Sequence, residues 1–183
     1  MPPKLIHYAG EDSDEFIKLR YNARLEFHDW DNDGKRDLLA TTRSAIWLIR
    51  NDGDQPAKFA KPQILFDSEL LQRRFSCCTA ADWNQDGRFD LVIGGRDGSV
   101  HWLRNDSLDK RAPSFADPFE LIAGNDAVTI PVIADGHYDR PLNPSGPLRV
   151  DVVDFSQDGK PDLLVGDACW NQTRIGLALL TNR

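Results

Sequence analysis

The chain has 183 residues, of which 40% are hydrophobic and 28% charged, and its formal net charge at pH 7 is −7. This length and composition fit one globular domain with a real core. The acidic balance argues against nucleic acid as a partner, which would need a basic face, no stretch is apolar enough for membrane insertion, and residues 1–10 lack the features of a signal peptide.

The first part of the chain predicts a series of short β-strands. Residues 1–9 hold an apolar stretch after two prolines, and proline at the start of a strand is tolerated because no ladder donor is lost there. An alternating strand follows from Ala23 to His28, and an acidic loop separates it from the apolar pair Leu38–Leu39. Two further strands are predicted at Ala45–Asn51 and, after another proline, at Lys61–Phe66.

This order of elements recurs twice. The nine-residue acidic loop at Asp29–Asp37 returns at Asp82–Asp90 and at Asp154–Asp162, each time between an alternating strand and an apolar strand. Four short strands per repeat, without any helical period, predict an all-β fold in which each repeat is a four-stranded antiparallel blade of a β-propeller. The three approximate repeats of the single propeller region 1–183 are residues 20–67, 73–123 and 148–183, with an insertion loop at 124–147.

Each acidic loop has the pattern D-x-[DNS]-x-D-G-x-x-D. Calcium takes about six to eight oxygen ligands at roughly 2.3–2.6 Å, and side chains at positions one, three, five and nine can supply them. Position seven is Lys or Arg, so its backbone carbonyl is the expected ligand, and glycine at position six allows the turn. The predicted calcium ligands are Asp29, Asp31, Asp33, Lys35 (backbone O) and Asp37; Asp82, Asn84, Asp86, Arg88 (backbone O) and Asp90; and Asp154, Ser156, Asp158, Lys160 (backbone O) and Asp162.

Two other interpretations of these loops exist. An EF-hand would need a Glu at position twelve and flanking helices, but that position holds Ala40, Ile93 or Val165. Acidic runs with Asn and Gly can also be solvated hairpin turns, although three copies in equivalent contexts favour metal binding. The sequence therefore predicts up to three Ca²⁺ ions. The first loop, with four carboxylates, is expected to bind most tightly, and Ser156 is the weakest of the predicted ligands.

The loops and the strands that follow them carry a family resemblance. Asp-Leu-Val-Ile-Gly-Gly at 90–95 and Asp-Leu-Leu-Val-Gly-Asp at 162–167 follow two of the loops. This arrangement resembles the FG-GAP/VCBS repeat, which builds the propeller of integrin alpha subunits and of many secreted bacterial proteins. The resemblance covers nearly all of residues 20–183. It implies structural calcium between the first two strands of each blade and an extracellular, cell-surface or periplasmic location.

The number of repeats leaves two architectures open. A closed propeller has about four to eight blades, so three blades form a partial propeller or one that closes by oligomerisation. A homodimer would give a six-blade ring, whereas a fragment would need the remainder of a longer propeller. Residues 1–9 resemble a fourth strand and are expected to form the outer strand of an adjoining blade.

Ligand contacts are predicted in the non-repetitive segments, because long loops on a repeat scaffold are the usual place for specificity. In the insertion, His137, Tyr138 and Arg140 are candidates for contact with a protein or glycan. In a smaller insertion, Trp170 could stack on a sugar ring. The plainer alternatives are a proline-stiffened surface loop and packing of Trp170 on the neighbouring blade.

Other recurrent residues favour packing roles. Loop position two is aromatic in each copy, as Trp30, Trp83 and Phe155, which favours packing between blades over ligand binding. Cys78 occupies the position of Leu25 and Val150 in the other repeats and is expected to be a small core residue.

The sequence favours a non-catalytic, calcium-binding propeller module for extracellular protein or glycan recognition. It contains no catalytic motif of the common hydrolase or nucleotide-binding classes, so no catalytic residue is predicted. The alternative is part of a propeller-type polysaccharide lyase acting on an acidic glycan, for which Arg140, Arg149 and His137 would be candidates. A third possibility is a purely architectural unit.

Overall fold

The computed structural model describes residues 23–42, 45–53, 58–67, 75–95, 97–122, 148–167 and 176–180. In this part of the chain all regular secondary structure is β, arranged in antiparallel sheets of four, four and three strands. The predicted all-β fold with sheets of successive antiparallel strands is confirmed. The strand expected in residues 1–9 and the insertion 124–147 lie outside the described residues.

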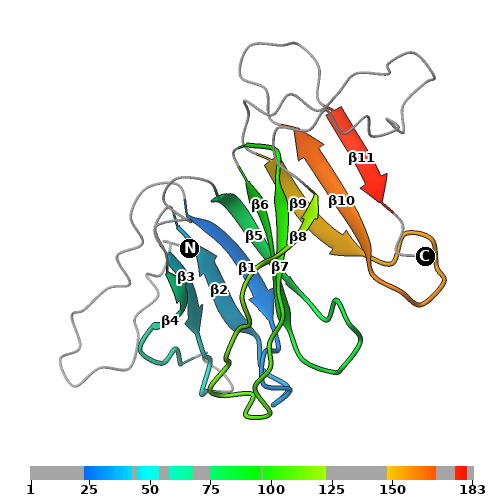
Figure 1. Ribbon diagram of the computed structural model, residues 1–183. Coiled ribbons are helices and arrows are strands. Elements are labelled where there is room, and N and C mark those ends of the chain that lie inside the picture. The colour runs from blue at the N-terminus through cyan, green and yellow to red at the C-terminus, as the bar shows by residue number, and fades with distance from the viewer. Residues whose placement is uncertain are drawn as a thin grey trace, which may run out of the picture.

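The strands follow one another across each sheet in chain order, as Figure 1 shows. This is the order that short hairpin connections produce, and it places the first strand of each repeat at one edge. The first sheet contains β1 (Arg24–His28), β2 (Asp37–Thr41), β3 (Ala45–Ile49) and β4 (Gln63–Asp67); the second contains β5 (Phe75–Ala81), β6 (Asp90–Gly95), β7 (Val100–Leu103) and β8 (Phe119–Ile122); the third contains β9 (Leu148–Val153), β10 (Asp162–Asp167) and β11 (Gly176–Leu180).

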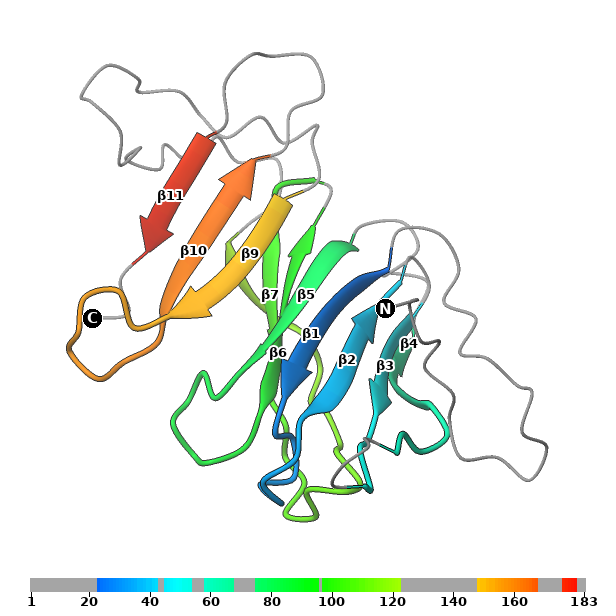
Figure 2. The same ribbon diagram turned by 180° about the vertical axis from the view of Figure 1, so that it is seen from behind.

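The three sheets stack face to face, and their first strands β1, β5 and β9 lie side by side (Figure 2). Alternating side chains point to opposite faces of a strand, so each sheet can contribute to two cores. One core lies between the first and second sheets and includes Leu39, Leu48 and Ile93. The other lies between the second and third sheets and includes Val92 and Val150.

The two inter-sheet cores confirm several packing expectations. Cys78 is fully buried in the first core. Trp30 is buried beside it and stacks on Phe89 of the second repeat, with ring centroids 5.6 Å apart. Trp83 packs against the second core. Phe155, the third aromatic of this set, is exposed, so it does not take part in packing among the described residues.

Gly94 in β6 marks the closest approach of the second and third sheets. A Cβ at this position would lie 3.0 Å from Cys77 Sγ, 3.1 Å from Val150 Cγ1 and 3.2 Å from the Leu148 carbonyl oxygen. The Cys77 thiol donates to that carbonyl at 2.9 Å and accepts from the Val150 N–H at 3.3 Å. The missing side chain therefore lets Cys77 reach the backbone of β9.

The first sheet carries apolar side chains on the face that points away from the second sheet. Leu25 pairs with Ala40 and Phe27 with Leu38 across β1 and β2, so these four side chains share a face. Leu25 and Phe27 are 50% and 49% exposed. The residues at the position of Leu25 in the other two repeats, Cys78 and Val150, are covered by the preceding sheet and are 0% and 1% exposed.

Candidate metal centre

The three acidic loops share one backbone conformation. Position six is Gly34, Gly87 or Gly159, with φ between 84° and 87°, a region that side chains with a Cβ rarely adopt. Position four also has positive φ, near 59°, and is an amide side chain in each loop: Asn32, Gln85 and Gln157. The motif predicts the turn at the glycine but not the positive φ at position four, where an Asn or Gln recurs in each loop.

The first loop brings together three of its predicted ligands. One carboxylate oxygen from each of Asp29, Asp31 and Asp33 lies within 4.8 Å of the other two. Asp29 accepts a hydrogen bond from the Gly34 N–H at 3.1 Å through Oδ2, and the N–H of Lys35 donates to Asp33 Oδ1 at 2.9 Å. These bonds fold the loop around its own carboxylates.

Two oxygens of this group have no hydrogen-bond partner. Asp29 Oδ1 and Asp31 Oδ1 are buried and accept from no donor in the described part of the chain. Burial of a charged oxygen without a partner is costly, and polar groups of this kind in a native fold call for an explanation such as an ion. A hard cation that prefers carboxylate oxygens, such as Ca²⁺, fits this donor set.

The carboxylate at loop position nine is buried and accepts hydrogen bonds from the loop and the neighbouring strand. Asp37 accepts from the Asn51 N–H at 2.8 Å and the Trp30 N–H at 3.0 Å, one on each oxygen. It is not in the group of three carboxylates. Burial raises the pKa of Asp37, the N–H donors of Asn51 and Trp30 lower it, and the charges of Asp31 and Asp33 raise it, so that it lies above its usual value.

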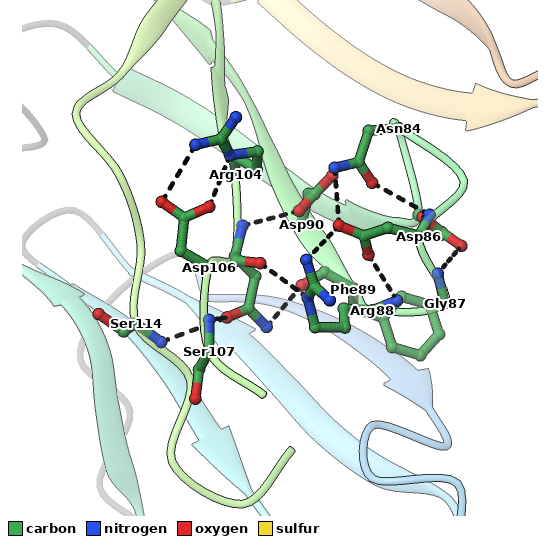
Figure 3. A network of polar contacts seen from close by, with 12 residues as sticks. Asn84, Asp86, Gly87, Arg88, Phe89, Asp90, Arg104, Asp106, Ser107 and Ser114 are labelled. Atoms are coloured by element: carbon green, nitrogen blue, oxygen red, sulfur yellow. Dashed lines mark hydrogen bonds and ion pairs between the residues drawn. The ribbon is translucent and has the colours of Figure 1, made fainter. Parts of the chain in front are cut away.

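Asp90 in the second loop, labelled in Figure 3, also accepts hydrogen bonds from its neighbours. Its donors are the Asn105 N–H at 2.8 Å and the Trp102 indole at 2.9 Å. Burial raises the pKa of Asp90 above its usual value in spite of these donors. In the third loop, Asp162 is also buried and accepts from the Ser156 N–H at 2.8 Å. Position nine thus joins the first two loops to a residue just after the third strand of the sheet, and in the third loop it accepts from the loop's own backbone.

The first carboxylate of the second loop has both oxygens occupied. Asp82 Oδ1 accepts from the Asp86 N–H and Oδ2 from the Gly87 N–H, each at 2.8 Å. Around Asp86, the Asn84 side chain donates at 2.7 Å and the Arg88 guanidinium forms an ion pair (Figure 3). The carboxylates of this loop therefore accept hydrogen bonds from donors of the same loop.

The carboxylates of the third loop also accept hydrogen bonds from N–H groups of their own loop. Asp154 accepts from the Asp158 N–H at 3.1 Å and the Gly159 N–H at 3.0 Å, one on each oxygen. The N–H of Lys160 donates to Asp158 Oδ1 at 2.9 Å. A carboxylate oxygen has a second lone pair and could still bind a cation, but among the three loops only the first leaves buried ligand oxygens unpartnered within the described residues.

A residue that the sequence did not single out lies beside the first loop. Arg111, in the connection between β7 and β8, places Nε 3.1 Å from Asp31 Oδ2. The two residues are 80 positions apart and belong to different repeats, and no periodicity or motif marked the arginine. The predicted ligand contacts His137, Tyr138, Arg140 and Trp170 lie outside the described residues.

Stacked antiparallel sheets of four, four and three strands in the described residues, each with an acidic loop after its first strand, define a propeller-type repeat module. The sequence matches the model of the FG-GAP-like repeat over residues 29–93 and again over 82–165. The chain belongs to the FG-GAP-like repeat family, whose repeats are typical of extracellular proteins. No match to a curated protein was found. Within the described residues there is no helix with the length and apolarity of a membrane span.

Proposed function

We propose that this chain is a calcium-stabilised, non-catalytic propeller module that recognises a protein or glycan outside the cell. The observation that carries the calcium part is the pair of unpartnered, buried oxygens, Asp29 Oδ1 and Asp31 Oδ1, in a group of three carboxylates. Carboxylate oxygens of this kind are the ligands that Ca²⁺ prefers.

The electrostatics of the first loop support a divalent cation. Three carboxylates within 4.8 Å of one another repel, and the side chain of Asp31 is only 8% exposed, so water screens it poorly. A bound cation would replace this repulsion by attraction. Because it would bind the folded loop and not the unfolded chain, it would also raise the free energy of unfolding by mass action.

A structural role for calcium is supported by where the loop lies. The loop joins β1 to β2, and its position-nine carboxylate, Asp37, is bonded to Asn51 beyond the end of β3. A cation here would stabilise the turn that connects three strands of the first sheet. Catalytic metal sites instead keep open positions for substrate, whereas five loop positions are expected to donate oxygens here.

Recognition of an extracellular protein or glycan is the second part of the proposal. It is supported by the family, whose repeats are typical of extracellular proteins, and by the exposed loops that a stack of sheets presents at its ends. No observation favours the polysaccharide lyase alternative. Of its candidate residues only Arg149 is described, and its side chain is exposed on β9.

We also infer that the half-exposed β1 edge of the first sheet packs on the third sheet of a second copy of the chain. Leu25 and Phe27 are half exposed at positions that the preceding sheet covers in the other repeats. On the same face Leu38 and Ala40 are buried, so within the described residues the half-exposed part of this face is its β1 edge. Two copies would supply six of the described sheets, within the range of about four to eight blades in closed propellers.

The calcium proposal is tested by isothermal titration of the apo chain with CaCl₂, together with melting curves in calcium and in chelator. We expect Asp31→Asn to lose the tightest binding event and most of the calcium-dependent rise in melting temperature. Asp117→Asn removes one exposed carboxylate just before β8 and is the matched control. An unaltered melting temperature of the wild-type chain in millimolar calcium would refute the proposal.

A further inference from the structure

The guanidinium of Arg111 bridges two carboxylates of the first repeat. Its Nε lies 3.1 Å from Asp31 Oδ2 and its Nη2 lies 3.2 Å from Asp52 Oδ1. Asp31 is a predicted calcium ligand, whereas Asp52 follows the end of β3. A planar fork of donors is suited to hold two such oxygens in fixed positions.

The connection that carries Arg111 is itself anchored to the first repeat. The Arg50 guanidinium donates to the carbonyl oxygen of Arg111 at 2.9 Å, and the N–H of Arg111 donates to Asp109 Oδ1 at 2.9 Å. In the orientation that gives both polar atoms of the Asn32 amide a hydrogen-bond partner, the nitrogen donates to the Asp29 carbonyl oxygen and the oxygen accepts from Lys110 Nζ. Two consecutive cationic residues of the second repeat thus contact the first acidic loop.

The two oxygens of Asp31 have different partners. Oδ2 is paired with Arg111, and Oδ1 is the buried oxygen without a partner. Arg111 therefore does not block the oxygen that is available to a cation. Instead it fixes the rotation of the carboxylate so that Oδ1 is held in the loop. Hydrogen-bond partners behind a ligating carboxylate orient it in this way in metal sites generally.

We propose that Arg111 is a positioning residue for a divalent cation in the first loop, supplied by the second repeat. This inference rests on the proposed calcium site and deepens it. Because the cation would bind Asp31 while Arg111 holds the same carboxylate from the next repeat, occupancy of the first loop and packing of the first two repeats are coupled.

Arg111 has two opposing effects on cation affinity: it orients the Asp31 carboxylate, which raises affinity, and its positive charge repels the cation, which lowers it. The positive charge of Arg111 disfavours a second cation nearby, but the arginine side chain is 58% exposed, so solvent screens this repulsion. Loss of an outer partner of a metal ligand typically lowers affinity by about 10- to 100-fold. We expect orientation to dominate, with the effect near the lower end of that range because of the exposure.

The test uses a background in which the other loops are disabled by Asp86→Asn and Asp158→Asn, so that titration with CaCl₂ reports the first loop. Arg111→Met is expected to weaken binding about tenfold, and Arg111→Lys to restore part of the affinity because an ammonium holds only one carboxylate well. Arg104→Met is the matched control, since Arg104 lies in the same connection and pairs with Asp106.

A second measurement tests the coupling between repeats. Hydrogen exchange of residues 104–116 should slow on addition of calcium to the background chain and should not respond in the Arg111→Met variant. An unchanged or increased calcium affinity of Arg111→Met would overturn the proposal, because Arg111 would then be a bystander or a competitor. Absence of calcium binding by the background chain itself would instead overturn the proposed site, and the inference with it.

Discussion

The hydroxyl of Thr79 in β5 donates a hydrogen bond to Oε2 of Glu26 in β1 at 3.0 Å, and so joins the first strands of two sheets. Glu26 also pairs with Arg24 at 2.8 Å and with His28 at 3.2 Å. Its side chain is 17% exposed. Because this carboxylate contacts both sheets and two basic neighbours, we expect the stacking of the first two repeats to depend on pH.

The first prediction is that Glu26→Gln removes this pH sensitivity. Burial raises the pKa of Glu26, but the hydrogen bond from His28, the charge of Arg24 and the hydrogen bond from Thr79 outweigh it, so the pKa lies below 4.5. A lowered folded-state pKa contributes stability that is complete above the unfolded value and disappears as the pH falls through the folded value. We expect a loss of about 1 kcal/mol at neutral pH, vanishing in acid.

Melting curves of Glu26→Gln and of the wild-type chain between pH 3 and pH 7 check this. A loss of about 1 kcal/mol corresponds to a decrease of about 2–4 °C for a chain of this size. Glu120→Gln, at an exposed carboxylate on β8, is the control and should change little. A difference between Glu26→Gln and wild type that is as large at pH 3 as at pH 7 would contradict the linkage.

The second prediction concerns the close approach at Gly94. Gly94→Ala places a methyl group 3.0–3.2 Å from atoms of Cys77, Val150 and Leu148, and overpacking of this kind costs about 1–3 kcal/mol. Gly166 is at the equivalent position of β10, where the nearest atom would be 3.8 Å away. Gly166→Ala should therefore be neutral or slightly stabilising, since alanine restricts the unfolded chain.

Chemical denaturation of the two variants gives the comparison directly. Equal free energies of unfolding for Gly94→Ala and Gly166→Ala would mean that the second and third sheets separate easily at this point. The predicted difference would instead show that the backbone contact between the Cys77 thiol and β9 depends on the missing side chain.

The third prediction distinguishes two roles of the carboxylate at loop position nine: accepting hydrogen bonds from neighbouring residues and binding a metal ion. Asp90→Asn presents an amide N–H₂ where Asp90 now accepts from Asn105 and Trp102. Leaving a buried donor without an acceptor costs about 1–3 kcal/mol. We expect Asp90→Asn to lower the free energy of unfolding in chelator as well as in calcium, and to change the fluorescence of Trp102.

Asp86→Asn is the comparison variant for position nine. Asp86 is exposed and its partners lie within its own loop, so its replacement should cost little in chelator. A calcium-dependent loss for Asp90→Asn with no loss in chelator would show that the carboxylate acts as a ligand alone.

The fourth prediction tests assembly through the half-exposed β1 edge of the first sheet. Light scattering in calcium is expected to give the mass of a dimer for the wild-type chain and of a monomer for Leu25→Ser with Phe27→Ser, because polar side chains at these half-exposed positions remove the apolar contact. Leu108→Ser, at an exposed residue of the β7–β8 connection, is the control. A wild-type monomer over the accessible concentration range would contradict the inferred ring.

The strands and loops could be read largely from the sequence. Predicted strands at Ala23–His28, Ala45–Asn51 and Lys61–Phe66 correspond to β1, β3 and β4 with shifts of one to two residues. The end of β3 differs because Asn51 leaves the ladder: its N–H bonds to Asp37 and its side chain accepts from the N–H groups of Gly53 and Lys58. Asx residues often bond the nearby backbone in this way and end a strand.

The candidate site was predictable only in part. Loop spacing placed the carboxylates of Asp29, Asp31 and Asp33 together, since alternate residues of a tight turn face one interior. It did not reveal that Asp37 is held by backbone donors, or that the first loop differs from the others in leaving oxygens without partners. In the second and third loops the N–H at position five donates to the position-one carboxylate, whereas Asp29 Oδ1 in the first loop accepts from no described donor, and the shared motif does not encode this difference.

The sequence by itself determined the repeats, the strand order and the shape of the acidic loops, because these depend on local properties: alternation of apolar residues, glycine at position six and carboxylates at fixed spacing. Only the tertiary structure decided which side chains meet across the repeats, as Arg111 meets Asp31 and Thr79 meets Glu26. Such contacts depend on how the stacked sheets are rotated and spaced. Glu26 and Thr79 occupy equivalent positions of two repeats, 53 residues apart, but the repeat does not show that they touch, and the 80-residue separation of Arg111 from Asp31 matches no repeat spacing.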